Sequence, residues 1–215
     1  MTPTFPITRE KIRNHFHYFW WQYALLIVGS IFLWNLLYTT THYRSPEHLK
    51  VEWYYEGPYV PQTQSLADQL LKDIHPQIFP EMEEVTFTLV GTDENYGVMQ
   101  LVVWMSAGQG DLYMLTGDSF EHHASTGGFV DLQPYVDDGT LHVEGIDLKK
   151  GYIKNTDTGE KVLYGIPADS LKGLEAHAIF PEDTFLCILA TGGNTENTLK
   201  LMNYLLDNMK EALPQ

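Results

Sequence analysis

Residues 85–115 read VTFTLVGTDENYGVMQLVVWMSAGQGDLYML and set the architecture of the chain. Val85–Val90 alternates small polar and apolar positions, which predicts a strand that ends at Gly91. Tyr96–Ala107 predicts a helix, because its apolar residues recur at helical spacing and a glycine, Gly108, follows its end. Asp111–Leu115 then predicts a short buried strand. The helical residues that we expect to face inward are Val98, Leu101, Val102 and Met105.

The preceding and following segments continue this alternation of strands and helices. Leu49–Tyr55 is aromatic and β-branched and predicts a strand, and Ser65 is expected to cap a helix that Pro76 stops. Ser119–Thr126 predicts one or two helical turns. Short connections between alternating strands and helices favour a parallel sheet with right-handed crossovers.

The C-terminal third adds three elements. Gly151–Pro167 predicts a hairpin that turns at Asn155–Gly159, and Phe185–Ala190 predicts a further strand. Asn194 or Thr195 is expected to cap a last amphipathic helix. The predicted fold class is therefore α/β, with one doubly wound, mostly parallel sheet.

A separate feature is Asn14–Tyr43, a stretch without Lys, Arg, Asp or Glu, whose centre Trp20–Tyr38 reads WWQYALLIVGSIFLWNLLY. About 20 apolar residues rising 1.5 Å each cross a ~30 Å hydrocarbon layer as one helix. Aromatic residues crowd both ends, as expected at the two headgroup zones. We expect a cytoplasmic tail at 1–17, a transmembrane helix at 18–40, a tether at 41–48 and an extracytoplasmic lobe at 49–215.

Flanking charges set the expected orientation. Arg9, Lys11 and Arg13 precede the span, whereas Arg44 and Lys50 follow it, and cationic flanks stay in the cytoplasm. The sequence thus predicts a single-pass protein of the cell membrane with a cytoplasmic N-terminus. A cleaved secretory signal is an alternative, but the apolar run is long for one and no A-x-A-like site follows. A buried core helix is a second alternative, disfavoured by the length.

Charge and cysteine content limit the possible partners. Residues 45–215 carry nine Lys, no Arg and 27 acids, a net charge of −18 against −15 for the whole chain. Such an acidic domain repels phosphate backbones, so nucleic acid is not an expected partner. Cys187 is the single cysteine and lies in an apolar run, so we expect a buried, inert thiol and no disulfide within the chain.

Four segments carry motifs in a definite order: Met99–Leu115 (MQLVVWMSAGQGDLYML), Thr126–Asp138 (TGGFVDLQPYVDD), Lys161–Asp169 (KVLYGIPAD) and Cys187–Leu206 (CILATGGNTENTLKLMNYLL). They resemble the "aGegD", "kGallDLtpyi", "GkvYGlP" and "sknkeaAlkFlnyl" elements of bacterial extracellular solute-binding proteins of the type 2, sugar- and peptide-binding class. The resemblance covers most of residues 49–210. It implies the fold of the N-terminal lobe of such a protein behind a transmembrane anchor.

The chain also departs from that family. The family places its second lobe between the "YGlP" strand and the return strand, whereas residues 170–184 supply 15 positions here. The family's usual lipid-anchor cysteine is absent, and a helix takes its place. The resemblance therefore implies a single lobe on a membrane stalk, which cannot by itself close two lobes around a ligand.

Ligands of doubly wound sheets sit beyond the carboxyl ends of the strands. In sugar-binding relatives, loops at this edge hold carboxylates for hydroxyl groups and aromatic residues for ring faces. Carried over residue by residue, the resemblance implies ligand-binding roles for Tyr59, Asp93, Asp118, Phe120 and Asp169. Ordinary loop acids and turn residues are the alternative interpretation.

No catalytic residue, metal site or cofactor is expected. Gly117–Phe120 also resembles the nucleophile block of GDSL-type esterases, but no Asp-x-x-His supplies a base, and Ser119 is better explained as a helix N-cap. His122-His123 are adjacent, so on a helix they point apart rather than at one ion. The acidic turns at Asp137–Gly139 and Asp157–Gly159 lack the ligand spacing of a calcium loop.

The sequence thus predicts a non-enzymatic, membrane-anchored lobe that acts as an accessory or interaction module of a membrane complex, such as an ABC transporter with its permease, or a sensor. The alternative is a weak sugar or peptide binder, including a homodimer whose two lobes form the cleft. A GDSL-like esterase is a third, more distant alternative.

Overall fold

The computed structural model describes residues 9–41, 45–91 and 96–210. The chain divides into two compact units, Met1–Arg44 and Ser45–Gln215. The first contains one helix, α1 (Arg9–Thr41). Its stretch Ile12–Thr41 is long and apolar enough to cross a membrane. Its large apolar side chains, such as Leu26 and Trp34, are exposed, which argues against the core helix of a soluble domain.

The second unit is built on a five-stranded sheet with the order β2-β1-β3-β7-β6. The three strands β1, β2 and β3 are parallel, and β7 runs antiparallel to both of its neighbours. Four of the five strands therefore share one direction, which confirms the predicted α/β fold with a mostly parallel sheet. The strands are β1 (Lys50–Gly57), β2 (Glu84–Gly91), β3 (Leu112–Thr116), β6 (Ile166–Pro167) and β7 (Thr184–Ile188).

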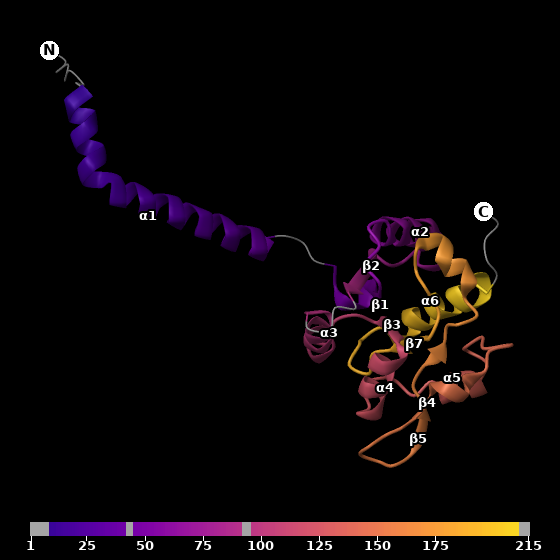
Figure 1. The fold of residues 1–215 in the computed structure, drawn as a ribbon. Coiled ribbons are helices and arrows are strands. Elements are labelled where there is room, and N and C mark those ends of the chain that lie inside the picture. Colours follow the sequence, from indigo (N-terminus) through magenta and orange to yellow (C-terminus); the bar gives the residue numbers. More distant parts are fainter. Residues whose placement is uncertain (1–8, 42–44, 92–95, 211–215) are drawn as a thin grey trace. The chain divides into compact units, whose positions relative to one another are not determined.

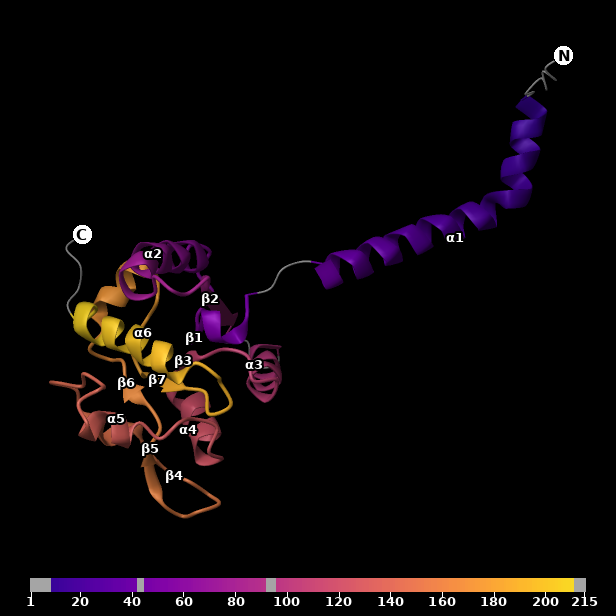
Figure 2. The same cartoon turned by 180° about the vertical axis from the view of Figure 1, so that it is seen from behind.

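Helices cover both faces of this sheet (Figures 1 and 2). One face carries a core that joins Trp53 and Met114 to the apolar stripes of α2 and α6. The other face carries a core that joins Tyr54 and Tyr113 to α3 and α4. The helices and remaining elements are η1 (Glu47–Leu49), α2 (Thr63–Ile78), α3 (Tyr96–Ser106), α4 (Gly117–Ser125), α5 (Gln133–Asp137), η2 (Leu148–Gly151), a hairpin of β4 (Tyr152–Lys154) and β5 (Lys161–Leu163), η3 (Lys172–His177) and α6 (Thr195–Asn208).

Some local predictions were wrong. Helix α2 begins after Gln62, two residues before Ser65, and continues past Pro76 to Ile78. The Ser65 hydroxyl donates to the Gln62 carbonyl at 2.9 Å instead of capping the helix. On α3, Leu101 and Met105 are buried as expected, whereas Val98 and Val102 are exposed.

Candidate functional site at the carboxyl edge of the sheet

Glu56, near the carboxyl end of β1, is a buried carboxylate with 5% of its surface exposed. It accepts hydrogen bonds from the Thr116 N–H at 3.0 Å, the Thr116 hydroxyl at 2.9 Å and the Ser119 hydroxyl at 2.7 Å. A buried carboxylate needs such donors to offset its lost hydration. Glu56 thus joins β1 to the junction between β3 and α4, a role that its sequence context (Glu56-Gly57-Pro58) did not reveal.

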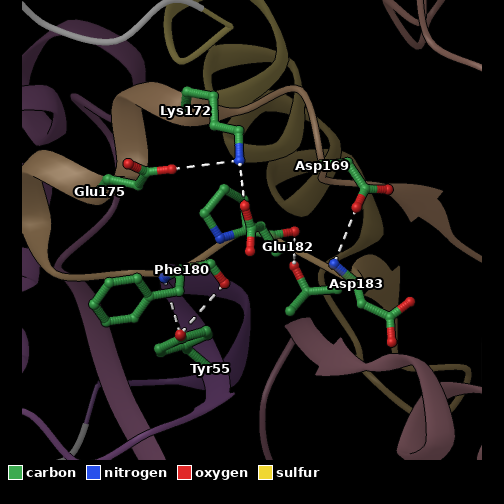
Figure 3. A network of polar contacts seen from close by, with 9 residues as sticks. Tyr55, Asp169, Lys172, Glu175, Phe180, Glu182 and Asp183 are labelled. Atoms are coloured by element: carbon green, nitrogen blue, oxygen red, sulfur yellow. Dashed lines mark hydrogen bonds and ion pairs between the residues drawn. The ribbon is translucent and has the colours of Figure 1, made fainter.

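The segment 169–184 crosses the same edge of the sheet (Figure 3). The Phe180 N–H donates to the Tyr55 hydroxyl at 3.0 Å, and that hydroxyl donates to the Phe180 carbonyl at 3.5 Å. The Thr63 hydroxyl, at the start of α2, donates to the Ala178 carbonyl at 3.0 Å. Burial raises the pKa of Tyr55, so the phenol stays neutral. The segment is therefore held against β1 and α2 and lies over the end of β1.

Ion pairs lie along the outer side of this segment. Lys172 contacts Glu182 at 3.0 Å and Glu175 at 3.4 Å (Figure 3). The hydrogen bond that Lys172 donates to Glu182 raises the pKa of Lys172, with a smaller contribution from Glu175. Because all three side chains are exposed, solvent screens these pairs and they add little stability.

Asp183 connects the segment to Asp169 and to the start of α4. The Asp183 N–H donates to the Asp169 carboxylate at 3.0 Å, and the Asp183 carbonyl accepts the Gly117 N–H at 2.9 Å. A Cβ at Gly117 would come 3.0 Å from the Asp183 carboxylate, so that side chain lies at the start of α4, one residue from Asp118. Asp118 follows β3 and Asp169 follows β6, two strands of one direction, so both residues lie at the carboxyl edge of the sheet. The sequence did not single out Asp183.

The other residues predicted to bind ligand lie in different surroundings. Tyr59 is 78% exposed, beyond the end of β1. Phe120 is 1% exposed and stacks on Phe185 with ring centroids 4.3 Å apart. Phe120 therefore packs in the core and presents no ring face at the edge, contrary to the role implied for it. Asp93 lies outside the described residues.

The surface of the unit has a small hollow near the carboxyl edge of the sheet and a larger one away from the predicted ligand residues. A hollow of about 160 Å³ is lined by Asp169, Ser170 and Lys150 together with Gly145, Ile146, Asp147 and Pro167. Sites for small molecules usually have about 300–1,000 Å³. A larger hollow, about 470 Å³, lies beside the end of α6, where His142 and Asp207 form a 2.8 Å contact. The predicted ligand residues do not line it.

Ser119 has no catalytic environment in the part of the chain that the structure describes. Its hydroxyl donates to Glu56, and the N-cap of α4 is Thr116, so the predicted N-cap role of Ser119 was wrong. The His122 and His123 rings lie edge to face 5.0 Å apart, and burial together with the His122 charge lowers the pKa of His123. Among the described residues, no group of three or more His, Cys, Asp or Glu is placed to hold a metal ion.

Comparisons with known proteins give limited results. No protein-family model and no curated protein matches the chain. Among solved structures, it is similar to an extracellular solute-binding protein family 1 member from Alicyclobacillus acidocaldarius (18% identity, TM-score 0.43, covering 58% of this chain and 29% of that one). It is also similar to the N-glycan transport solute-binding protein of Streptococcus pneumoniae in complex with Man5GlcNAc (19% identity, TM-score 0.39, covering 55% of this chain and 24% of that one). A third similar structure is a de novo designed cysteine esterase (18% identity, TM-score 0.43, covering 58% of this chain and 28% of that one).

Solute-binding proteins are thus among the structure neighbours, and they are the class that the four sequence motifs resemble. The chain covers less than a third of the length of these structures. With identities below 25% and TM-scores below 0.5, these likenesses carry no argument about activity.

Proposed function

We propose that this chain is a membrane-anchored, non-enzymatic interaction module. In this proposal α1 spans the cell membrane with its N-terminus in the cytoplasm and holds the α/β unit outside. The unit acts as an accessory of a membrane complex, such as an ABC transporter, by docking on another protein rather than by capturing a solute.

The observation that carries this proposal is the covered carboxyl edge. A doubly wound sheet binds ligands beyond the carboxyl ends of its strands. Here the segment 169–184 occupies that position over β1, fixed by the bonds of Tyr55 and Thr63 to its backbone. Phe120, the aromatic residue expected to face a ligand, supports the core instead. A second observation is the exposed apolar surface of α3, because monomeric proteins rarely expose such surface without a partner.

Crosslinking of the full chain in its native membranes, followed by mass spectrometry, tests the docking role. We expect reproducible crosslinks from the α/β unit to a membrane protein, which an unrelated single-pass protein of similar abundance does not give. Absence of any protein crosslink from this unit would contradict the proposal.

Orientation is tested separately with single cysteines. Native Cys187 is fully buried, so a new surface cysteine reports alone. A membrane-impermeant maleimide applied to intact cells should label Asp157→Cys, in the exposed β4–β5 turn, and not Glu10→Cys. The reverse pattern would place the α/β unit in the cytoplasm.

The position of Asp118 and Asp169 at the carboxyl edge of the sheet favours a second candidate function, weak binding of a sugar or peptide through these two residues. Carboxylates suit hydroxyl and ammonium groups. A panel of sugars and peptides would then raise the melting temperature of the chain. Asp118→Ala or Asp169→Ala should abolish that shift, and Asp157→Ala, at an exposed turn elsewhere, should not.

A further inference from the structure

Helix α3 presents an apolar stripe to solvent. Val98, Met99, Val102 and Val103 are 46%, 69%, 41% and 58% exposed. Their spacing of one, four and five residues places them side by side over two turns of one helix face. Within residues 45–91 and 96–210, the other large apolar side chains with comparable exposure are Tyr59 and Phe180. Most of the exposed large apolar residues of the unit therefore lie on one helix.

The stripe is held rigidly on the sheet. Leu101 and Met105, on the opposite side of α3, belong to the core under the helix. The Trp104 ring contacts Tyr54 edge to face at a centroid distance of 5.1 Å, and Tyr54 stacks on Tyr113 at 5.1 Å. Since the core side of α3 is anchored in this way, its outer side is a preformed surface whose ordering costs a partner little.

The strand beside α3 is also unpaired on one side. Strand β2 is the terminal strand of the sheet, so within the described ranges its outer edge has no neighbouring strand. Gln64 covers one backbone carbonyl of β2 by donating to Phe87 at 2.7 Å. Uncovered strand edges favour pairing with another chain. Helix α3, which carries the apolar stripe, packs against this terminal strand.

We propose that the α3 stripe docks on the α3 stripe of a second copy of this chain, related by a two-fold axis, with the open edge of β2 extending the contact. This inference rests on the proposed role as an anchored interaction module and names its first partner.

The uncharged sequence of α3 suits pairing with a second copy. In a two-fold interface each patch meets itself, so a charged patch would face like charges. Residues 95–110 contain no charged residue, although the unit as a whole carries −18. The stripe is therefore a place where two such acidic units approach without like charges meeting. A basic partner protein would find no carboxylate on α3, and a lipid surface would find no Lys or Arg, which interfacial helices carry.

The size of the contact also fits a pair of anchored copies. Stable complexes of free proteins bury about 800 Å² per partner, more than four side chains provide. The β2 edge adds to this area. Two copies held in one membrane also meet at a high effective concentration, so a smaller interface suffices.

Cysteine crosslinking of the full chain in membranes tests the pairing. Met99→Cys and Val103→Cys, treated with a short bismaleimide, should each give a product of twice the mass of the chain. The unmodified chain should give none, because Cys187 is buried. Gln69→Cys, exposed on α2, is the matched control and should stay uncrosslinked. Val103→Glu added to Met99→Cys should abolish the doubled product, because it places a carboxylate against its own copy.

Three other results overturn the pairing. Equal crosslinking at Gln69→Cys would assign the dimer to contacts other than α3, and absence of a doubled product at both stripe positions would exclude self-association there. A product of a different mass would identify another protein on the stripe, which contradicts the pairing and leaves the proposed docking role intact. Conversely, a doubled product together with no other crosslinked protein would support the pairing and contradict the role as an accessory of a larger complex.

Discussion

The hydroxyl of Tyr55 accepts the Phe180 N–H at 3.0 Å, which joins the end of the central strand β1 to a residue 125 positions later. Phe180 lies in the segment 169–184, at the place where the resembled solute-binding family inserts its second lobe. In this chain the segment turns back over the sheet instead, and Tyr55, buried in the core, fixes it there. The same hydrogen bond thus stabilises the fold and covers the edge at which a ligand would bind.

Tyr55→Phe removes this hydrogen bond, so the Phe180 N–H loses the acceptor that the Tyr55 hydroxyl provides. We expect the free energy of unfolding to fall by about 1–2 kcal/mol, the usual cost of losing one buried hydrogen bond. Backbone amides of residues 172–184 should also exchange faster with solvent, measured by hydrogen–deuterium exchange. Tyr59→Phe is the control, because Tyr59 is 78% exposed, and it should change neither quantity. Unchanged exchange in Tyr55→Phe would mean that other contacts hold the segment.

Glu56→Gln tests the buried carboxylate. The amide nitrogen that replaces one carboxylate oxygen is a donor, so the new side chain can accept either the bonds from Thr116 or the bond from Ser119, but not both. We expect a loss of about 2 kcal/mol in the free energy of unfolding, measured by urea denaturation, because hydrogen bonds to charged groups are the stronger kind. Glu121→Gln, on the exposed side of α4, should be nearly neutral.

Ser119→Ala separates the structural role of this serine from an esterase role. Removing the hydroxyl takes one donor from Glu56 and should cost about 1 kcal/mol of stability. Hydrolysis of a p-nitrophenyl ester by the purified chain should be the same before and after the change. A loss of hydrolysis confined to Ser119→Ala would revive the esterase interpretation.

The parts of the fold that sequence predicted are those with strong local signals. Strand β2 and helix α3 were located within about one residue, because alternation, helical spacing and Gly108 agree there. Of the four residues predicted to face inward on α3, only Leu101 and Met105 are buried. Most residues of this helix are apolar, so their spacing does not determine which side is buried. Strand β7 runs antiparallel to its neighbours because the segment 169–184 stays at one edge of the sheet, whereas a parallel strand would require the chain to cross back to the opposite edge.

The candidate site was less predictable, because its contacts join residues far apart in sequence. Asp118 and Asp169 were placed on the same edge by the rule for doubly wound sheets, and the structure does bring them there. Glu56 gave no such signal: one acid after an apolar strand resembles an ordinary strand end, and its burial depends on donors about 60 residues later. The role predicted for Phe120 was wrong because its ring stacks on Phe185 in the core. Phe185 lies 65 residues later, so the local sequence pattern around Phe120 does not reveal this contact.

The free energy of unfolding should depend on pH through His177, which lies at the end of η3. Burial lowers the pKa of His177 from its ordinary value of 6.5, with a backbone hydrogen bond to Leu66 and the Asp73 charge acting in the opposite direction. Its Nε2 is buried without a hydrogen-bond partner among the described residues. The unfolded chain therefore takes up a proton at a higher pH than the folded chain does. Stability is then constant above the unfolded pKa and falls as the pH drops below it toward the folded pKa.

We accordingly expect the melting temperature to fall between about pH 7.5 and pH 5.5, above the range in which ordinary carboxylates titrate. His177→Gln, which cannot titrate, should flatten this decline. His123→Gln should flatten it further, because the pKa of His123 is also lowered by burial. His48→Gln, on the exposed η1, is the control and should leave the slope unchanged. An equal decline in the His123/His177 double variant would assign the acid sensitivity to other groups.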